Sequence, residues 1–156
     1  MNRMYNAMGA ALLGASMLAG PAQAQQGIEG KVAKLEFEVT IRDKEPYGNV
    51  NGKPAVRYYF DLVLKGGGGV SVDFEKVTRY LSSGLLEESD KERGTSWISG
   101  KCGSTHLDYN SKCFMSKRWF FSTEKDDLFS ETWHLKDANG NKVSKEYRIP
   151  TSAYSK

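Results

Sequence analysis

The sequence predicts an all-β domain, an antiparallel β-sandwich of about seven strands held by one disulfide. Three observations support this prediction. Apolar and polar residues alternate in several short segments, turn-forming residues separate these segments, and two cysteines lie in a chain that begins like an exported protein. The alternative is a short helix near residues 73–84, which would make the fold α+β or a small β-barrel.

Alternation of apolar and polar residues predicts the first two strands. In residues 34–42 every second residue is apolar, which is typical of a half-buried strand. Residues 43–54 hold two prolines and an Asn-Gly pair, so they predict a turn region. The same alternation returns over residues 56–65 and predicts the second strand. The four glycines at 66–69 predict a flexible loop, since the Gly-Lys-Ser/Thr of a phosphate-binding loop does not follow them.

The middle of the chain allows two interpretations. Residues 70–74 alternate like a strand, but the next apolar residues are spaced as on one face of a helix. These residues are Phe74, Val77 and Leu81. A short helix and a strand with a bulge therefore both fit residues 73–84. The charged segment 85–94 predicts a solvated loop, and a short strand is expected over residues 95–99.

The C-terminal part of the chain predicts three further strands. Two of them are expected over residues 114–122 and 129–136. Asn139-Gly140 then separates two alternating runs, which is a strong signal for a tight hairpin. Over about twenty residues this hairpin resembles the last two strands of bacterial immunoglobulin-like modules, so the expected sandwich is immunoglobulin-like. The tail after Pro150 is expected to be loose.

Residues 1–24 are predicted to be a cleavable secretory signal peptide. A positive start at Arg3 precedes an uncharged, largely apolar run, and small residues place the cleavage site after Ala24. That run is too short to span a membrane, and no later segment predicts a transmembrane anchor. The absence of a twin-arginine pair favours the general secretory route. The pattern is typical of bacteria, so residues 25–156 are expected to form a single periplasmic or secreted β-rich domain.

The charge and the cysteines exclude several classes of function. A formal net charge of +3 over 156 residues is too small for a protein that binds nucleic acid through bulk electrostatics. Cys102 and Cys113 are the two cysteines of the chain, and in an exported protein they predict a structural disulfide. Neither belongs to a Cys-x-x-Cys pair, so no metal site is expected. No cofactor is predicted either.

Catalytic residues are poorly represented. The chain has two histidines, and His134 is expected on the polar face of a strand. His106 lies between Ser104 and Asp108, but the members of a catalytic triad normally come from separate elements rather than from one short loop. No catalytic residue is therefore predicted. A small exported hydrolase that uses His106 is kept as an alternative.

Two features predict a binding surface instead. The disulfide would hold residues 103–112 as a stapled loop, and rigidly held loops often carry binding residues. The candidates on this stapled loop are His106, Asp108 and Tyr109. Large aromatic residues also occupy both faces of two strands, which predicts either a fully covered core or an exposed aromatic patch. Such a patch would contain Tyr59 and Phe120, or else Trp119 and Phe121, and the candidates kept are Tyr59, Trp119 and Phe120.

Together these features predict an exported, non-catalytic β-domain that binds a protein or glycan partner in the cell envelope or the extracellular space. The stapled loop and the nearby aromatic residues would form its binding surface. A barrel-type carrier of an apolar ligand is a further alternative to the hydrolase. No oligomeric state is predicted.

Overall fold

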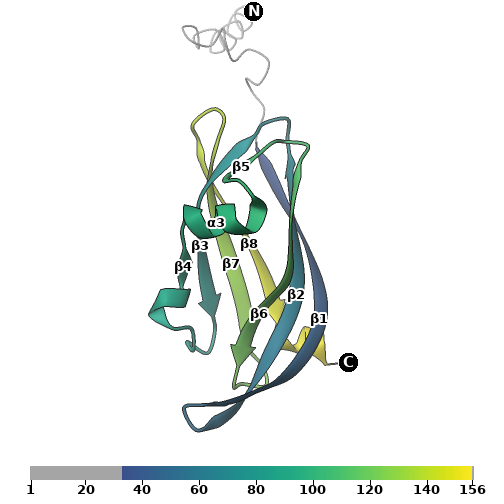
Figure 1. The fold of residues 1–156 in the computed structure, drawn as a ribbon, viewed down its shortest axis with the longest axis vertical. Helices are drawn as coiled ribbons and strands as arrows, with labels where there is room; N and C mark the ends of the chain where they lie inside the picture. Colours follow the sequence, from purple (N-terminus) through teal and green to yellow (C-terminus); the bar gives the residue numbers. More distant parts are fainter. Residues whose placement is uncertain (1–32, 156) are drawn as a thin grey trace, which may run out of the picture. The chain divides into compact units, whose positions relative to one another are not determined.

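The computed structural model describes residues 33–155, which form two antiparallel sheets (Figure 1). The first sheet has the order β1-β2-β6 and the second the order β4-β3-β7-β8, with β5 paired to β3. The strands are β1 (Lys34–Val50), β2 (Lys53–Gly67), β3 (Val72–Leu81), β4 (Glu92–Arg93), β5 (His106–Leu107), β6 (Lys112–Ser122), β7 (Leu128–Asp137) and β8 (Lys142–Pro150). The predicted all-β sandwich is therefore confirmed, whereas the predicted signal peptide lies outside the described residues.

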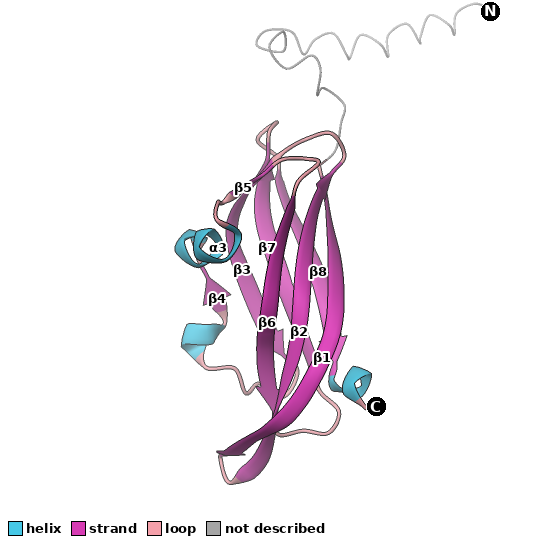
Figure 2. Cartoon of the chain, turned by 45° about the vertical axis from the view of Figure 1, so that its right-hand side comes forward, coloured by secondary structure: helices cyan, strands magenta, loops and turns pink. Residues whose placement is uncertain are grey.

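The strand order is that of an immunoglobulin-like sandwich. In the immunoglobulin fold, strands A, B and E lie in one sheet and strands C, F and G in the other. Here β1, β2 and β6 take the places of A, B and E, while β3, β7 and β8 take those of C, F and G. The short β4 extends the second sheet beside β3, and the helix α3 (Thr95–Cys102) lies between β4 and β6 in the chain. Figure 2 shows α3 at one side of the two sheets.

Of the two interpretations of residues 73–84, the strand with a bulge is correct, because these residues belong mainly to the strand β3. A register shift between Phe74 and Lys76 adds one residue to β3 at a β-bulge. Phe74 and Val77 consequently both face the core, although they are three residues apart. The bulge thus imitates the spacing of a helix in the sequence.

The strand predicted over residues 95–99 is also wrong, since α3 occupies this segment. Ile98 and Cys102 lie four residues apart, which places them on one side of the helix. Ile98 is fully buried and Cys102 packs against the core. Gly103 follows the helix in the left-handed conformation, with φ of 79°, and ends it.

Two predicted loops are more ordered than the sequence suggests. β1 continues to Val50 through two register shifts, and the chain turns at Asn51 and Gly52, both with positive φ. Because β1 is an edge strand, it tolerates Pro46. The tail is not loose: the 3-10 helix η2 (Thr151–Tyr154) buries Tyr154, whose hydroxyl donates to the carbonyl of Tyr59 at 2.9 Å.

The four-glycine segment is divided between a strand and a turn. Gly66 and Gly67 end β2, whereas Gly68 and Gly69 form the turn with φ of 78° and 75°. Gly66 lies where the stapled loop crosses β2, and its N–H donates to the carbonyl of Ser111 at 3.0 Å. The loop predicted over residues 66–69 is therefore shorter than expected and is confined to the turn at Gly68 and Gly69.

Substitution of Gly66 by alanine is expected to lower the free energy of unfolding by about 1–3 kcal/mol. A Cβ at this position would overlap the carbonyl oxygen of Asp108, so the loop backbone would have to move. Gly67→Ala is a matched control, because its nearest contact would be Lys34 Cβ at an ordinary 3.6 Å. Urea unfolding of both variants tests this, and equal losses would contradict it.

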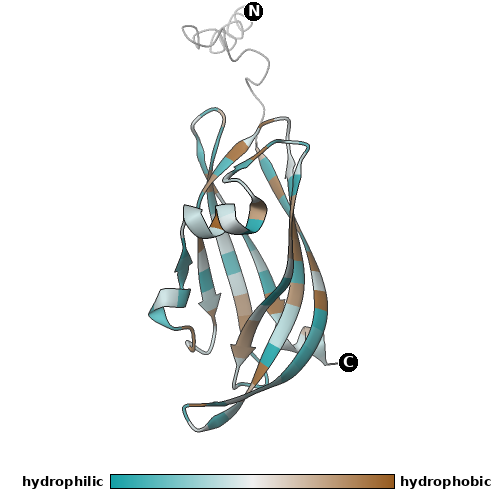
Figure 3. Cartoon of the chain, viewed as in Figure 1, coloured by the Kyte–Doolittle hydropathy of each residue, from teal (hydrophilic) through white to brown (hydrophobic). Residues whose placement is uncertain are grey.

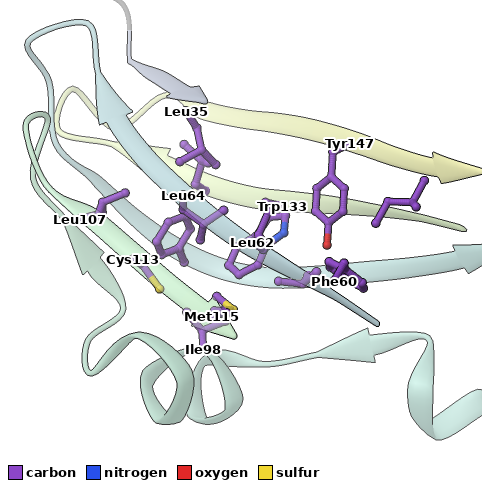
Figure 4. Packing of buried hydrophobic residues seen from close by; sticks show 14 of the residues in the cluster. Leu35, Phe60, Leu62, Leu64, Ile98, Leu107, Cys113, Met115, Trp133 and Tyr147 are labelled. Atoms are coloured by element: carbon purple, nitrogen blue, oxygen red, sulfur yellow. The ribbon is translucent and has the colours of Figure 1, made fainter. Parts of the chain in front are cut away.

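Aromatic and aliphatic side chains fill the space between the two sheets (Figure 4). Phe120 of β6 stacks on Phe129 of β7 with ring centres 4.5 Å apart, which joins one sheet to the other. Trp133 is fully buried and packs against Phe74 with ring centres 5.2 Å apart. The alternating hydropathy along the strands is visible in Figure 3. The interior between the two sheets is therefore a packed core of side chains.

Candidate binding site

A β-bulge in β6 decides which aromatic residues reach the surface. Ser116 and Lys117 are both exposed, so the inward-outward alternation shifts by one residue after Met115. Arg118 and Phe120 consequently face the core and Trp119 faces solvent. This corrects the prediction that Phe120 is a surface binding residue, because its side chain is 1% exposed.

Asp61 holds this bulge in place. Lys117 has a φ of 52°, which is unusual for a residue other than glycine. Its backbone N–H donates to Asp61 Oδ1 at 2.9 Å, and Arg42 Nε donates to Asp61 Oδ2 at 2.7 Å. The N–H of Lys117, together with Arg42, lowers the pKa of Asp61 in spite of its burial. A buried carboxylate on β2 thus fixes the backbone that turns Trp119 outward.

Four aromatic rings and one arginine gather on the outer side of the first sheet. We call this group the aromatic face, and its members are Tyr47, Arg57, Tyr59, Trp119 and Phe121. The guanidinium carbon of Arg57 lies 4.5 Å from the ring centre of Tyr47 and 4.6 Å from that of Trp119. Tyr47 also stacks on Phe121 with ring centres 4.9 Å apart.

The aromatic face is preorganised and still open to solvent. The Tyr59 hydroxyl donates to Glu45 at 2.6 Å and accepts from Arg57 Nη1 at 3.0 Å. These contacts hold Arg57 against the rings. Trp119 is nonetheless 41% exposed and Tyr47 37% exposed. Large exposed rings with a fixed arginine between them are typical of the residues that dominate binding at protein interfaces.

A cleft of about 180 Å³ lies beside Trp119, between β6, α3 and the segment that carries β4. We call it the basic cleft, because five cationic side chains line it. These are Arg79, Arg93, Lys101, Lys117 and Arg118. Trp97 and Trp119 contribute its aromatic walls, and Asp90 is its one acidic lining residue.

A buried ionic cluster lies behind the basic cleft. Glu131 of β7 is fully buried and accepts hydrogen bonds from Arg118, from Tyr147 at 2.5 Å and from Arg79 Nε at 3.1 Å. Burial alone would raise the pKa of Glu131, but the two guanidinium groups outweigh it and hold this pKa below its usual value. Burial lowers the pKa of Arg79, and Glu131 offsets this in part. Two buried arginines therefore share one carboxylate.

The stapled loop lies at a different place from the aromatic face. Lys112, at the end of the loop, and Trp119 pair with Lys65 and Tyr59, which lie six residues apart on β2, or about 20 Å at roughly 3.3 Å per residue. Tyr109 is 51% exposed, and His106 and Asp108 are exposed with it. The structure therefore separates the predicted loop residues from Trp119 and Tyr59 instead of joining them in one site.

His106 is held between two carboxylates. Its Nδ1 lies 2.8 Å from Asp73 and its Nε2 lies 3.2 Å from Asp108. The hydrogen bond with Asp73, strengthened by Asp108, raises the pKa of the imidazole. Ser104 Oγ contacts the backbone N–H of His106 rather than its ring. Both ring nitrogens are thus engaged with carboxylates, which does not favour a role in activating a serine nucleophile.

The predicted disulfide is confirmed. Cys102 of α3 and Cys113 of β6 are bonded, with Cα atoms 5.3 Å apart. Within residues 33–155, no three His, Cys, Asp or Glu side chains gather as a metal site. None of the helices in the described part of the chain combines the length and apolar character of a membrane span.

Comparisons with known proteins identify no family for this chain. No protein-family model matches the sequence, and no curated protein is significantly similar to it. A solved structure, an X-ray structure of a Northeast Structural Genomics Consortium target, covers 75% of this chain and 85% of that chain. Its TM-score is 0.48 and its sequence identity is 10%.

Sequence reasoning missed the ionic cluster and two members of the aromatic face, Tyr47 and Arg57. A signal for Glu131 was present, because this residue alternates with Phe129 and Trp133 and therefore lies on the buried face. For Arg118 no such signal exists, since the bulge before it reverses the alternation.

Proposed function

We propose that this chain is an exported, non-catalytic binding domain whose partner is a protein. Export is supported by the disulfide, which persists in oxidising compartments, together with the signal-peptide pattern of residues 1–24. The filled core favours a surface site over an enclosed apolar ligand.

The aromatic face is the observation that favours a protein as the partner. Trp, Tyr and Arg are the residue types enriched in binding hot spots, and Arg57 brings all three types into contact here. Its guanidinium lies over rings that a sugar would need for stacking, which favours a protein over a glycan. Trp119, at the edge of this face, is the residue on which the partner is expected to depend most.

Capture of exported proteins by the mature chain tests this proposal. Trp119→Ala is expected to weaken the captured interaction by at least about 30-fold, the effect of a hot-spot residue. Phe114→Ala is the matched control, since Phe114 is an aromatic residue of β6 that is 60% exposed, more than Trp119, and lies outside the aromatic face. The control should change the affinity less than about twofold, the effect expected of a residue outside a hot spot.

Two outcomes would contradict the proposal. One is capture by Trp119→Ala that equals capture by the wild type. The other is capture that survives proteolysis of the exported fraction and is lost on periodate oxidation, since that result would identify a glycan. Thermal unfolding of both variants, followed by circular dichroism, verifies that they are folded.

A further inference from the structure

The basic cleft concentrates positive charge in a chain whose formal net charge is +3. Five cationic side chains line the cleft, and Asp90 and the buried Glu131 are the carboxylates that pair with them. Among the described residues, Lys101 and Lys117 form no ion pair. The lining of the cleft and the buried Glu131 behind it thus hold three more positive charges than negative ones.

Buried arginines make this cleft more than a solvated basic surface. The side chains of Arg79 and Arg118 are 9% and 6% exposed, and each has Glu131 as its charged partner. Their orientation is fixed, because Glu131 and Tyr147 bind Arg118 while Arg79 also donates to the carbonyl of Trp119 at 3.3 Å. Fixed donors in a partly desolvated site bind anions more strongly than mobile surface lysines do.

Donor groups in the wall of the cleft lack acceptors. Arg93 pairs with Asp90 at 2.5 Å, but its Nε is buried and has no hydrogen-bond partner among the described residues. Arg79 uses Nε and Nη2, whereas its Nη1 has no partner in the part of the chain that the structure describes. Arg93 Nε is too buried to meet an anion in the cleft, whereas Arg79 Nη1, free among the described residues, is a donor on a residue that lines the cleft. An oxyanion would supply the acceptor that this donor lacks.

We propose that the basic cleft is an oxyanion site that takes a carboxylate from the protein bound at the aromatic face. The volume of about 180 Å³ equals that of about six water molecules, which suits one small anionic group rather than a polymer. Trp119 belongs to both the cleft and the aromatic face, so an acidic side chain of a partner bound on this face would lie within reach of the cleft. The source of the carboxylate rests on the proposed function, whereas the oxyanion site does not.

Titration of the mature chain with small anions tests the site without the partner. The probes are sodium sulfate, sodium phosphate and a blocked tetraglutamate peptide, each added at constant ionic strength and followed by NMR. Saturable binding should fall at least about tenfold in K101Q/K117Q, because each substitution removes a charge-assisted hydrogen bond. The control K142Q/K145Q removes the same charge from exposed residues of β8 and should change the affinity less than about twofold, as expected for screened surface charges.

The probes distinguish the source of the anion. Binding of the peptide assigns the site to carboxylates and supports the full proposal. Binding of sulfate or phosphate without the peptide supports an oxyanion site and overturns its assignment to a partner's carboxylate. No saturable binding, or equal losses in both double variants, overturns the site itself.

A further variant separates this inference from the proposed function. Tyr47→Ala alters the aromatic face but lies outside the residues that line the cleft. It should weaken capture of the partner and leave anion affinity within about twofold of the wild type, since Tyr47 donates no charge-assisted hydrogen bond to the cleft. If capture fails while small anions bind, the proposed function is wrong and the oxyanion site remains.

Discussion

Replacement of Glu131 by glutamine is expected to lower the free energy of unfolding by about 3–5 kcal/mol, the cost of removing one partner from a buried ion pair. The variant keeps the shape of the side chain but leaves Arg79 and Arg118 with no buried counter-charge. Urea unfolding measures the loss. Glu146→Gln on the neighbouring strand β8 is the control, because Glu146 is exposed and its pairing with Arg148 lies at the surface. Surface changes of this kind usually stay within about 0.5 kcal/mol.

A loss below about 1 kcal/mol at Glu131→Gln would contradict this prediction, because even one unsatisfied buried polar group costs about 1–3 kcal/mol. A quadruple variant, R79M/R118M/E131L/Y147F, then asks what the cluster is for. Tyr147 is included because its buried hydroxyl would otherwise lose both of its partners. Replacing a complete buried ion cluster with apolar residues is often neutral or stabilising by about 1–4 kcal/mol. We therefore expect the quadruple variant to fold and to lose anion binding. That combination would connect the cluster to the cleft rather than to stability.

The strands that the sequence predicts correctly are those in which the alternation is uninterrupted. β2 and β7 alternate over most of their length, and Asn139-Gly140 marks the last hairpin, with Gly140 at a φ of 86°. In these segments the side-chain period and the turn chemistry are both local properties. A single sequence therefore reports them directly.

The errors occur where tertiary contacts overrule local patterns. The bulge in β3 gives Phe74 and Val77 a helical spacing, while α3 has one fully buried residue, Ile98, and so shows little helical periodicity. The helix is instead fixed by the disulfide of Cys102 and by glycines at both ends. Neither cause is visible as a period in the sequence.

The sequence predicts an exposed group of aromatic residues, but which rings of β6 belong to the aromatic face depends on one inserted residue. The sequence shows that aromatic residues occupy both faces of β6, but only the bulge at Ser116 and Lys117 decides that Trp119 is outside and Phe120 inside. That bulge depends on Asp61, which lies on another strand. Tyr47 joins the face because β1 extends through a segment that reads as a turn.

Reduction of the Cys102–Cys113 disulfide is expected to lower the free energy of unfolding by about 3 kcal/mol, as chain-entropy arguments give for a loop of about ten residues. The two cysteines are 11 positions apart and are the only ones in the sequence. Urea unfolding of the same protein with and without reductant therefore measures this bond alone. The control is C102S/C113S, whose stability should not respond to the reductant.

The disulfide should also affect the basic cleft, because it ties α3 to β6 and both elements line the cleft. Lys101 is adjacent to Cys102 at the end of the helix, so a more mobile helix end would hold the ammonium group of Lys101 less firmly at the cleft. We expect reduction to weaken sulfate or peptide binding under conditions in which the domain stays folded. Unchanged anion affinity in a folded, reduced protein would show that packing of Ile98 alone positions the helix. A stability loss below about 1 kcal/mol would mean that the reduced chain retains the closed loop in its unfolded state.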